Sequence, residues 1–215
     1  NEENEPTLPS LTPAEKSVDS MLRRCVHYLS SSSIPVRIST LNTINVGLRV
    51  LRSNERALLP LVATVWPSVR VAVRASIRPG VGSDVPTCCC ALGCVATMAV
   101  LCGDFVRARV ANELWPLLRS ILVRETSRAR SMVKEEDLPF IATKAKTTKA
   151  KTKATRSEMR LLRSVLSTVC VLGACGMLRP ENVLDASMCC FRLLSMDRRV
   201  HDTMRMLSMR VLQRM

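Results

Sequence analysis

The sequence predicts an all-α protein, a HEAT- or armadillo-type α-solenoid built as a right-handed stack of antiparallel helix pairs. Three observations predict it. Apolar residues recur at helical spacing along most of the chain, and no segment alternates like a strand with hairpin turns. A short motif also occurs twice at a distance typical of helical repeats. The 215 residues fit one run of repeats, and a hydrophobic content of 47% is enough for a sizeable core.

The repeated motif contains a Trp-Pro pair followed three residues later by arginine. Its two copies are Val65-Trp66-Pro67-Ser68-Val69-Arg70 and Leu114-Trp115-Pro116-Leu117-Leu118-Arg119. The two prolines are 49 residues apart, near the period of about 40–47 residues in HEAT and armadillo proteins. Because proline inside a helical pattern usually kinks or ends a helix, we expect an irregularity at both places.

The chain is expected to begin with a tail and then to enter helical repeats. Residues 1–11 are acidic and contain prolines, which predicts a disordered tail. Thr12 and Glu15 have the spacing of a capping box, and Pro13 suits the first helical position. HEAT-like repeats are therefore expected over 12–125. Because the first residue is asparagine rather than methionine, we expect the sequence to be a fragment.

An uncharged stretch lies in the middle of these repeats. Residues 85–103 carry no charged side chain, so a membrane span must be weighed against a buried helix. Pro86 opens the stretch, Gly103 closes it, and no Trp/Tyr belt flanks it. We therefore expect a central helix packed between neighbours, followed by another helix from Asp104 to Glu125, and no membrane partner.

Helical periodicity is lost over 126–157 and resumes over 158–215. The first segment contains a low-complexity run of Lys, Thr and Ala, which predicts a disordered Lys-rich insert. The second predicts C-terminal HEAT-like repeats. The lysines of the candidate flexible basic segment are Lys144, Lys146, Lys149, Lys151 and Lys153.

The net charge of +14 suggests an acidic partner. Arg70, Arg74 and Arg78 are four residues apart, so they predict either a docking stripe for acidic groups or an ordinary solvated helix face. The Lys-rich insert could contact nucleic acid or act as a nuclear-import signal. Aromatic residues make up only 3% of the chain, so stacking-based nucleic-acid recognition is not expected.

Catalytic and metal-binding patterns are missing from the sequence. His27 and His201 both fall within helical patterns, and no Gly-x-Ser-x-Gly elbow is present. Cys90 and Cys94 could share a helix face with Cys102, but no second ligand pair has zinc-site spacing, so buried small hydrophobes are the favoured interpretation. We therefore expect no enzyme activity, no cofactor and no metal. The 10 cysteines, several of them contiguous, predict a reducing intracellular compartment.

Several of these segments resemble the C-terminal HEAT region of the Tel-two-interacting protein one family. The matching elements are Leu58-Leu59-Pro60-Leu61, Val65-Trp66-Pro67, residues 102–109 (Cys-Gly-Asp-Phe-Val-Arg-Ala-Arg), Leu114-Trp115-Pro116, residues 183–189 and Leu193-Leu194-Ser195. The resemblance covers roughly residues 14–125 and 158–215. The Gly-rich loop at 79–84 and the Lys-rich insert depart from the family pattern.

The resemblance implies a non-catalytic scaffold. Members of this family are the long subunit of the Triple T co-chaperone complex, which supports the folding, stability and assembly of phosphatidylinositol-3-kinase-related kinases. The implied partners are the other helical-repeat subunits, those kinases and assembly machinery linked to heat-shock protein 90. The implied location is the cytoplasm, and also the nucleus if the Lys-rich insert is an import signal. The alternative is a basic helical-repeat adaptor that binds nucleic acid or acidic protein cargo.

Overall fold

A computed structural model describes residues 11–75, 84–136, 148–194 and 202–214. Within these residues the chain is almost entirely helical and contains no strand, which confirms the all-α prediction. The helices are α1 (Pro13–Cys25), α2 (Ile34–Val50), α3 (Glu55–Ala75), α4 (Val85–Arg109), α5 (Trp115–Glu136), α6 (Thr148–Ala174), α7 (Pro180–Leu194) and α8 (Asp202–Gln213).

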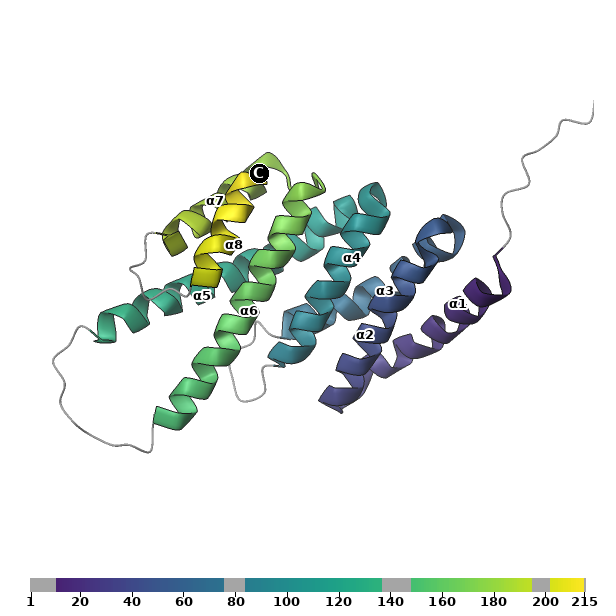
Figure 1. The fold of residues 1–215 in the computed structure, drawn as a ribbon, viewed down its shortest axis with the longest axis horizontal. Helices are drawn as coiled ribbons and strands as arrows, with labels where there is room; N and C mark the ends of the chain where they lie inside the picture. The colour runs from purple at the N-terminus through teal and green to yellow at the C-terminus, as the bar shows by residue number, and fades with distance from the viewer. Residues whose placement is uncertain (1–10, 76–83, 137–147, 195–201, 215) are drawn as a thin grey trace, which may run out of the picture.

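The helices form successive pairs that stack in two layers (Figure 1). Helix α1 pairs with α2, α3 with α4, α5 with α6, and α7 with α8. The even-numbered helices pack side by side in one layer, here called the even layer, and α1, α3, α5 and α7 form the odd layer. This arrangement confirms a helical-repeat solenoid, in which each repeat buries its apolar face against its neighbours.

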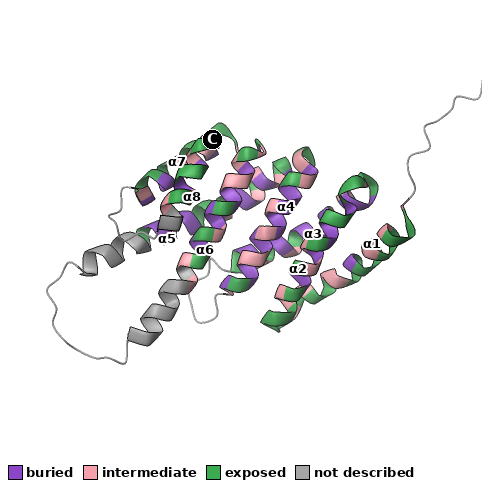
Figure 2. Cartoon of the chain, viewed as in Figure 1, coloured by how far each residue is buried: buried purple, intermediate pink, exposed green. Residues whose placement is uncertain are grey.

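The core lies between the two layers (Figure 2). Helix α4 is central to it, because it packs against α2, α3 and α6. Segments Glu55–Ala75 and Val85–Ser127 are long and apolar enough to cross a membrane, but 44% and 56% of their most apolar windows are buried inside the protein. Buried core helices pass the same length and composition test, so these segments are weak evidence for a membrane span.

The predicted capping box begins α1. The Thr12 side chain accepts a hydrogen bond from the Glu15 backbone N–H at 3.2 Å, and the Glu15 carboxylate accepts one from the Thr12 backbone N–H at 2.9 Å. Pro13 occupies the first helical position. These bonds satisfy backbone donors that the first turn of a helix leaves without partners.

Helix α4 bends where the uncharged stretch was predicted to end. Cys102 has φ −123° and ψ 21°, and Gly103 has φ 1° and ψ −94°, both outside the helical range. The chain then continues from Asp104 as helix through α5 with no loop between them. The break predicted at Gly103 is thus a sharp bend between two directly joined helices.

The repeated prolines do not end their helices. Helix α3 continues through Pro60 and Pro67. On the other side of the bend, a π-helical turn (Val110–Leu114) lies directly before Trp115 and Pro116. A π turn changes the hydrogen-bonding register of a helix, so it can accommodate a residue that has no backbone N–H.

The prediction of a disordered insert over 126–157 was too wide. Helix α5 continues to Glu136 and α6 begins at Thr148, so only 137–147 lies outside the described residues. Periodicity fails in these flanks, but alanine, arginine, lysine, methionine and glutamate all have favourable helix propensities. Each flank also extends a helix that is already anchored by packing, which removes the cost of nucleation. The predicted tail, residues 1–10 of it, also lies outside the described residues.

Asp84 joins the start of α4 to α2. Its side chain accepts a hydrogen bond from the Thr87 backbone N–H at 3.1 Å, which caps α4, and it forms an ion pair with Arg37. Burial alone would raise the pKa of Asp84, but the bonds from Thr87 and Arg37 outweigh it and lower the pKa.

Candidate functional site

The predicted arginine stripe on α3 is only partly available to a partner. The Arg70 Nη1 atom lies 2.7 Å from Oε2 of Glu113, so this residue already has a carboxylate partner in the chain. Arg74 is exposed and forms no ion pair within the described residues. Arg78 lies outside the described residues. A role of the stripe in docking stays a prediction. Of its two described residues, Arg70 is already paired with a carboxylate and Arg74 is not.

Glu113 connects the first Trp-Pro motif to the next helix of the odd layer. The buried Trp66 indole donates from Nε1 to Oε2 of Glu113 at 3.3 Å, and Arg70 binds the same oxygen. Glu113 lies in the π turn just before the second motif. Trp66 and Arg70, both from the first motif, therefore donate to one carboxylate oxygen of Glu113, which lies directly before the second motif.

The second motif makes an equivalent contact with α7. Arg119 corresponds to Arg70 in the repeated motif, and its Nε atom lies 2.6 Å from Oδ2 of Asp185. Arg179 also donates from Nη2 to Oδ1 of Asn112 at 2.8 Å. Arg119 thus binds a carboxylate on α7, the next odd-layer helix, and Arg70 binds one in the π turn that leads directly into α5. We call the pairs Arg70–Glu113 and Arg119–Asp185 the repeat clasps.

The clasp acceptors could not be found from the motif alone. Glu113 and Asp185 lie in different sequence contexts, and the partner of each arginine is 43 or more residues away. A usable signal was that Arg70 and Arg119 occupy the same position in the two copies of the motif, which indicates that both make the same kind of contact. Because both pairs are substantially exposed to solvent, their contribution to stability is small.

The candidate basic segment is divided by the boundary of α6. Lys144 and Lys146 lie outside the described residues. The backbone of Lys149, Lys151 and Lys153 belongs to the first turns of α6. This segment therefore includes the beginning of a long helix, and its binding role stays a prediction.

The cysteines are thiols that pack as small apolar side chains. None of the 10 forms a disulfide. The Cys94 Sγ atom donates to the carbonyl oxygen of Leu41 at 3.2 Å, and burial raises the pKa of Cys94 and of Cys190 to about 12. Burial also raises the pKa of Cys102 to about 11. Such thiols are protonated at neutral pH and are poor nucleophiles.

No metal site is found in the described part of the chain, where no three His, Cys, Asp or Glu side chains come together. An open depression along α1 is lined by basic, hydroxyl and apolar residues and has no acidic side chain. These residues are Lys16, Ser17, Ser20, Met21, Arg24, Cys25 and Tyr28.

Helix α7 has an exposed apolar face that the sequence reasoning missed. Leu184, Met188 and Phe191 expose 66%, 49% and 58% of their surface. Their i, i+4, i+7 spacing was a usable signal, but the same helix also contains a buried apolar face, and periodicity did not separate the two. We call these three residues the α7 stripe.

Comparison with known proteins agrees with the repeated motifs and the paired helices. The sequence model of a family described as the TTI1 C-terminal TPR domain matches residues 1–215. The chain is 31% identical over 126 residues to the TELO2-interacting protein 1 homolog of Homo sapiens, and 27% identical over 121 residues to that of Mus musculus.

Each alignment covers 56% of this chain and 10% of the relative, so the chain spans only a small part of these relatives. No solved structure matches the chain significantly. The family match extends over every residue, including both Trp-Pro motifs and the α7 stripe. The chain therefore belongs to the TTI1 family, within its C-terminal helical-repeat domain.

Proposed function

We propose that this chain is part of a non-catalytic scaffold subunit of a Triple-T-like co-chaperone complex. The observation that carries the proposal is the TTI1 family match over residues 1–215. In this proposal the complex supports the folding, stability and assembly of phosphatidylinositol-3-kinase-related kinases. The protein acts by holding other proteins together, without turnover of a small molecule.

The first proposed partner is a TELO2-like protein. Both curated relatives are named for interaction with TELO2. The further proposed partners are the other helical-repeat subunit of the complex, the kinases and assembly machinery linked to heat-shock protein 90. The proposed location is the cytoplasm, with the nucleus as a second location.

The architecture supports a scaffold role. A two-layer stack of helix pairs presents long outer faces, and each repeat contributes surface without needing a shared cavity. Three large exposed apolar side chains, Leu184, Met188 and Phe191, follow one face of α7. Large exposed apolar side chains that gather on one face are typical of protein interaction surfaces.

Affinity purification of the tagged full-length protein from its own cells tests the proposal. We expect a TELO2-like protein and phosphatidylinositol-3-kinase-related kinases to co-purify, and we expect depletion of the protein to lower the cellular amounts of those kinases. Purification without either class of protein, together with unchanged kinase amounts after depletion, would refute the scaffold role.

The net charge of +14 favours one second candidate, a basic adaptor for nucleic acid or acidic protein cargo. Replacing the five lysines of the candidate basic segment by glutamine tests it. The adaptor role predicts that binding to single-stranded RNA or to an acidic peptide weakens steeply with salt and is lost in the variant. Absence of binding at low salt would remove this candidate.

A further inference from the structure

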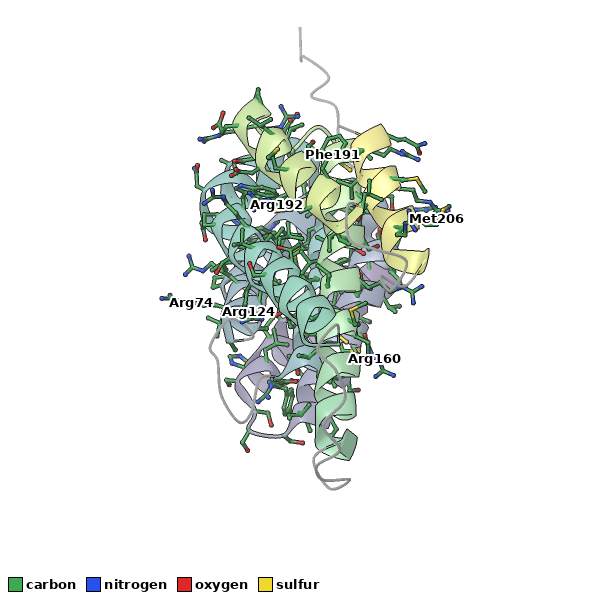
Figure 3. The ribbon with its side chains drawn as sticks, turned by 90° about the vertical axis from the view of Figure 1, so that its left-hand side faces the viewer. Arg74, Arg124, Arg160, Phe191, Arg192 and Met206 are labelled. Atoms are coloured by element: carbon green, nitrogen blue, oxygen red, sulfur yellow. The ribbon has the colours of Figure 1, made fainter. Side chains whose placement is uncertain are left out.

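Two arginines of α6 lie on the outer side of the even layer. Arg160 points away from that layer on the right of Figure 3, opposite to Arg74 of the odd layer. Arg160 and Arg163 are both exposed and three residues apart, so they share one side of the helix. Leu161 and Leu162 between them are buried. Neither arginine forms an ion pair within the described part of the chain, so both can bind a partner.

The neighbouring helix α4 brings no competing charge to these arginines. The Cys89 Sγ atom lies 3.9 Å from the carbonyl oxygen of Arg160, which places α6 directly beside the first turns of α4. Residues 85–103 contain no charged side chain. Asp84, which precedes them, is already paired with Arg37. On the α4 side, the surface next to Arg160 is therefore uncharged.

Helix α8 packs against α6 and adds apolar side chains to the same side of the molecule. Met206 and Met209 expose 50% and 42% of their surface and are three residues apart. Met206 points to the same side as Arg160 in Figure 3. The surface thus combines cations with apolar groups. We call Arg160, Arg163, Met206 and Met209 the α6–α8 face.

Helices α6 and α8 hold a large share of the surplus positive charge. Within their bounds they contain eight basic residues and two acidic residues, Glu158 and Asp202. Their net charge is therefore +6, out of +14 for the whole chain. The basic residues are Lys149, Lys151, Lys153, Arg156, Arg160, Arg163, Arg205 and Arg210.

Most described carboxylates of the chain are already engaged elsewhere. Nine acidic residues have described side chains, and eight of them form a hydrogen bond or ion pair within the chain, Glu55 being the exception. The eight are Glu15, Asp19, Asp84, Asp104, Glu113, Glu125, Glu181 and Asp185. A second copy of the chain would bring the same arginines and the same engaged carboxylates, so it matches the α6–α8 face poorly.

Nucleic acid also supplies negative charge, but this face lacks the groups that usually accompany its recognition. Proteins that bind single strands stack the bases on aromatic side chains. Helices α6 and α8 contain no aromatic residue. Methionine side chains instead adapt to the apolar side chains of protein partners. A protein segment that carries both carboxylates and apolar side chains fits better.

We propose that the α6–α8 face docks an acidic segment of a partner protein. Carboxylates of the segment pair with Arg160 and Arg163, and its apolar side chains cover Met206 and Met209. Arginine binds carboxylates through two parallel hydrogen bonds, and the net charge of these helices attracts the segment over a longer range. The inference rests on the proposed scaffold role and adds the surface and the chemistry of the segment that it holds.

A matched pair of double variants tests the docking face. Arg160→Glu with Arg163→Glu reverses two charges on α6, and Arg56→Glu with Arg74→Glu reverses two on α3. All four arginines are exposed and form no ion pair within the described residues, so the two variants have the same net charge. The probe is a fluorescein-labelled peptide of glutamate and leucine with glycine and serine spacers.

Fluorescence anisotropy measures binding of this peptide to the full-length protein, and circular dichroism verifies that the variants fold. We expect the α6 variant to bind at least about tenfold more weakly and the α3 variant less than about threefold more weakly. Met206→Gln with Met209→Gln should weaken binding of this peptide. The same methionine variant should bind a peptide with serine in place of leucine as well as the wild type does.

Three results would overturn the inference. The first is that the wild-type protein does not bind the glutamate–leucine peptide, and the second is that both charge variants lose affinity equally. The third is that the α6 variant loses another occupant: tighter binding of single-stranded RNA would assign the face to nucleic acid, and a wild-type dimer seen in sedimentation would assign it to a second copy.

Co-purification tests the proposed function separately. If a TELO2-like protein and the kinases co-purify with the wild-type protein but the peptide does not bind, the docking face is wrong and the scaffold role stands. If the peptide binds through the α6–α8 face and neither class of protein co-purifies, the Triple-T-like role falls and the docking face stands.

Discussion

Gly47 determines how closely α1 and α2 approach. A Cβ atom at this position would lie 2.4 Å from Cδ1 and 2.7 Å from Cδ2 of Leu22, which is fully buried. Gly93 on α4 offers a matched contrast, because a Cβ atom there meets no atom within 4 Å. Both glycines lie inside helices, so they differ in packing rather than in backbone role.

We therefore expect opposite effects from the same substitution. Alanine in place of glycine gains about 1 kcal/mol of helix propensity at either site. At Gly47, displacement of Leu22 costs about 1–3 kcal/mol and cancels or exceeds that gain. Urea unfolding should show that Gly93→Ala is stabilised and that Gly47→Ala is not. Equal stabilisation of both variants would show that α1 can move away from α2 without cost.

The acid side of the stability profile should depend on Asp84. Its pKa is lowered in the folded state, so its contribution is present above the unfolded pKa of about 3.9 and is lost as the pH falls through the folded pKa. Asp84→Asn keeps a capping oxygen but removes the charge that pairs with Arg37.

We expect Asp84→Asn to lower the free energy of unfolding by about 1–2 kcal/mol at neutral pH. The difference from wild type should shrink as the pH falls below about 4. Urea titrations at several pH values measure both quantities. A difference that stays constant from neutral to acidic pH would mean that the Asp84 charge is not the cause.

At the scale of helices, Trp66 and the first repeat clasp, Arg70–Glu113, should contribute unequally to stability. Trp66 is buried and 3% exposed, so Trp66→Ala should cost about 3–5 kcal/mol. Arg70 forms a partly exposed pair with Glu113, so Arg70→Ala should cost no more than about 1 kcal/mol. Thermal or urea unfolding of both variants measures the ratio. An Arg70→Ala effect as large as that of Trp66→Ala would make the ion pair, rather than indole burial, the main contact between these repeats.

The sequence predicted those elements whose signals are local. Thr12, Pro13 and Glu15 mark the start of α1 because their hydrogen bonds lie within one turn. Gly103 marks the bend because the change of backbone angles is confined to Cys102 and Gly103. Contacts across repeats were not predictable in this way. Neither the Arg70–Glu113 pair nor the exposure of Leu184 follows from periodicity, since both depend on where a distant helix packs.

At the scale of the whole molecule, stability should vary along the stack. Solenoid repeats contact only their neighbours, so an end pair loses fewer contacts on unfolding than a central one. Helix α7 packs against α5 and α8, whereas α4 packs on α2, α3 and α6. Cys190 on α7 and Cys94 on α4 can report the local unfolding of these two helices. Both thiols are buried, and burial raises the pKa of each to about 12.

We expect a thiol reagent at mildly alkaline pH to modify neither cysteine in the native protein. With increasing urea, Cys190 should become modified before Cys94, which mass spectrometry of tryptic peptides can follow. Simultaneous modification of both thiols across the urea range would indicate that the stack unfolds as a single cooperative unit.

The direct junction at Gly103 makes the molecule sensitive to length at one point. A loop can absorb an inserted residue, but a residue inserted just after Gly103 would rotate the helix that begins at Asp104 by about 100° relative to the part of α4 before the bend. Glu113, Trp115 and Arg119 would all turn away from their contacts together. The number of residues at this junction therefore determines how the next repeat is rotated about its helix axis. We expect relatives to have no insertions or deletions at this position.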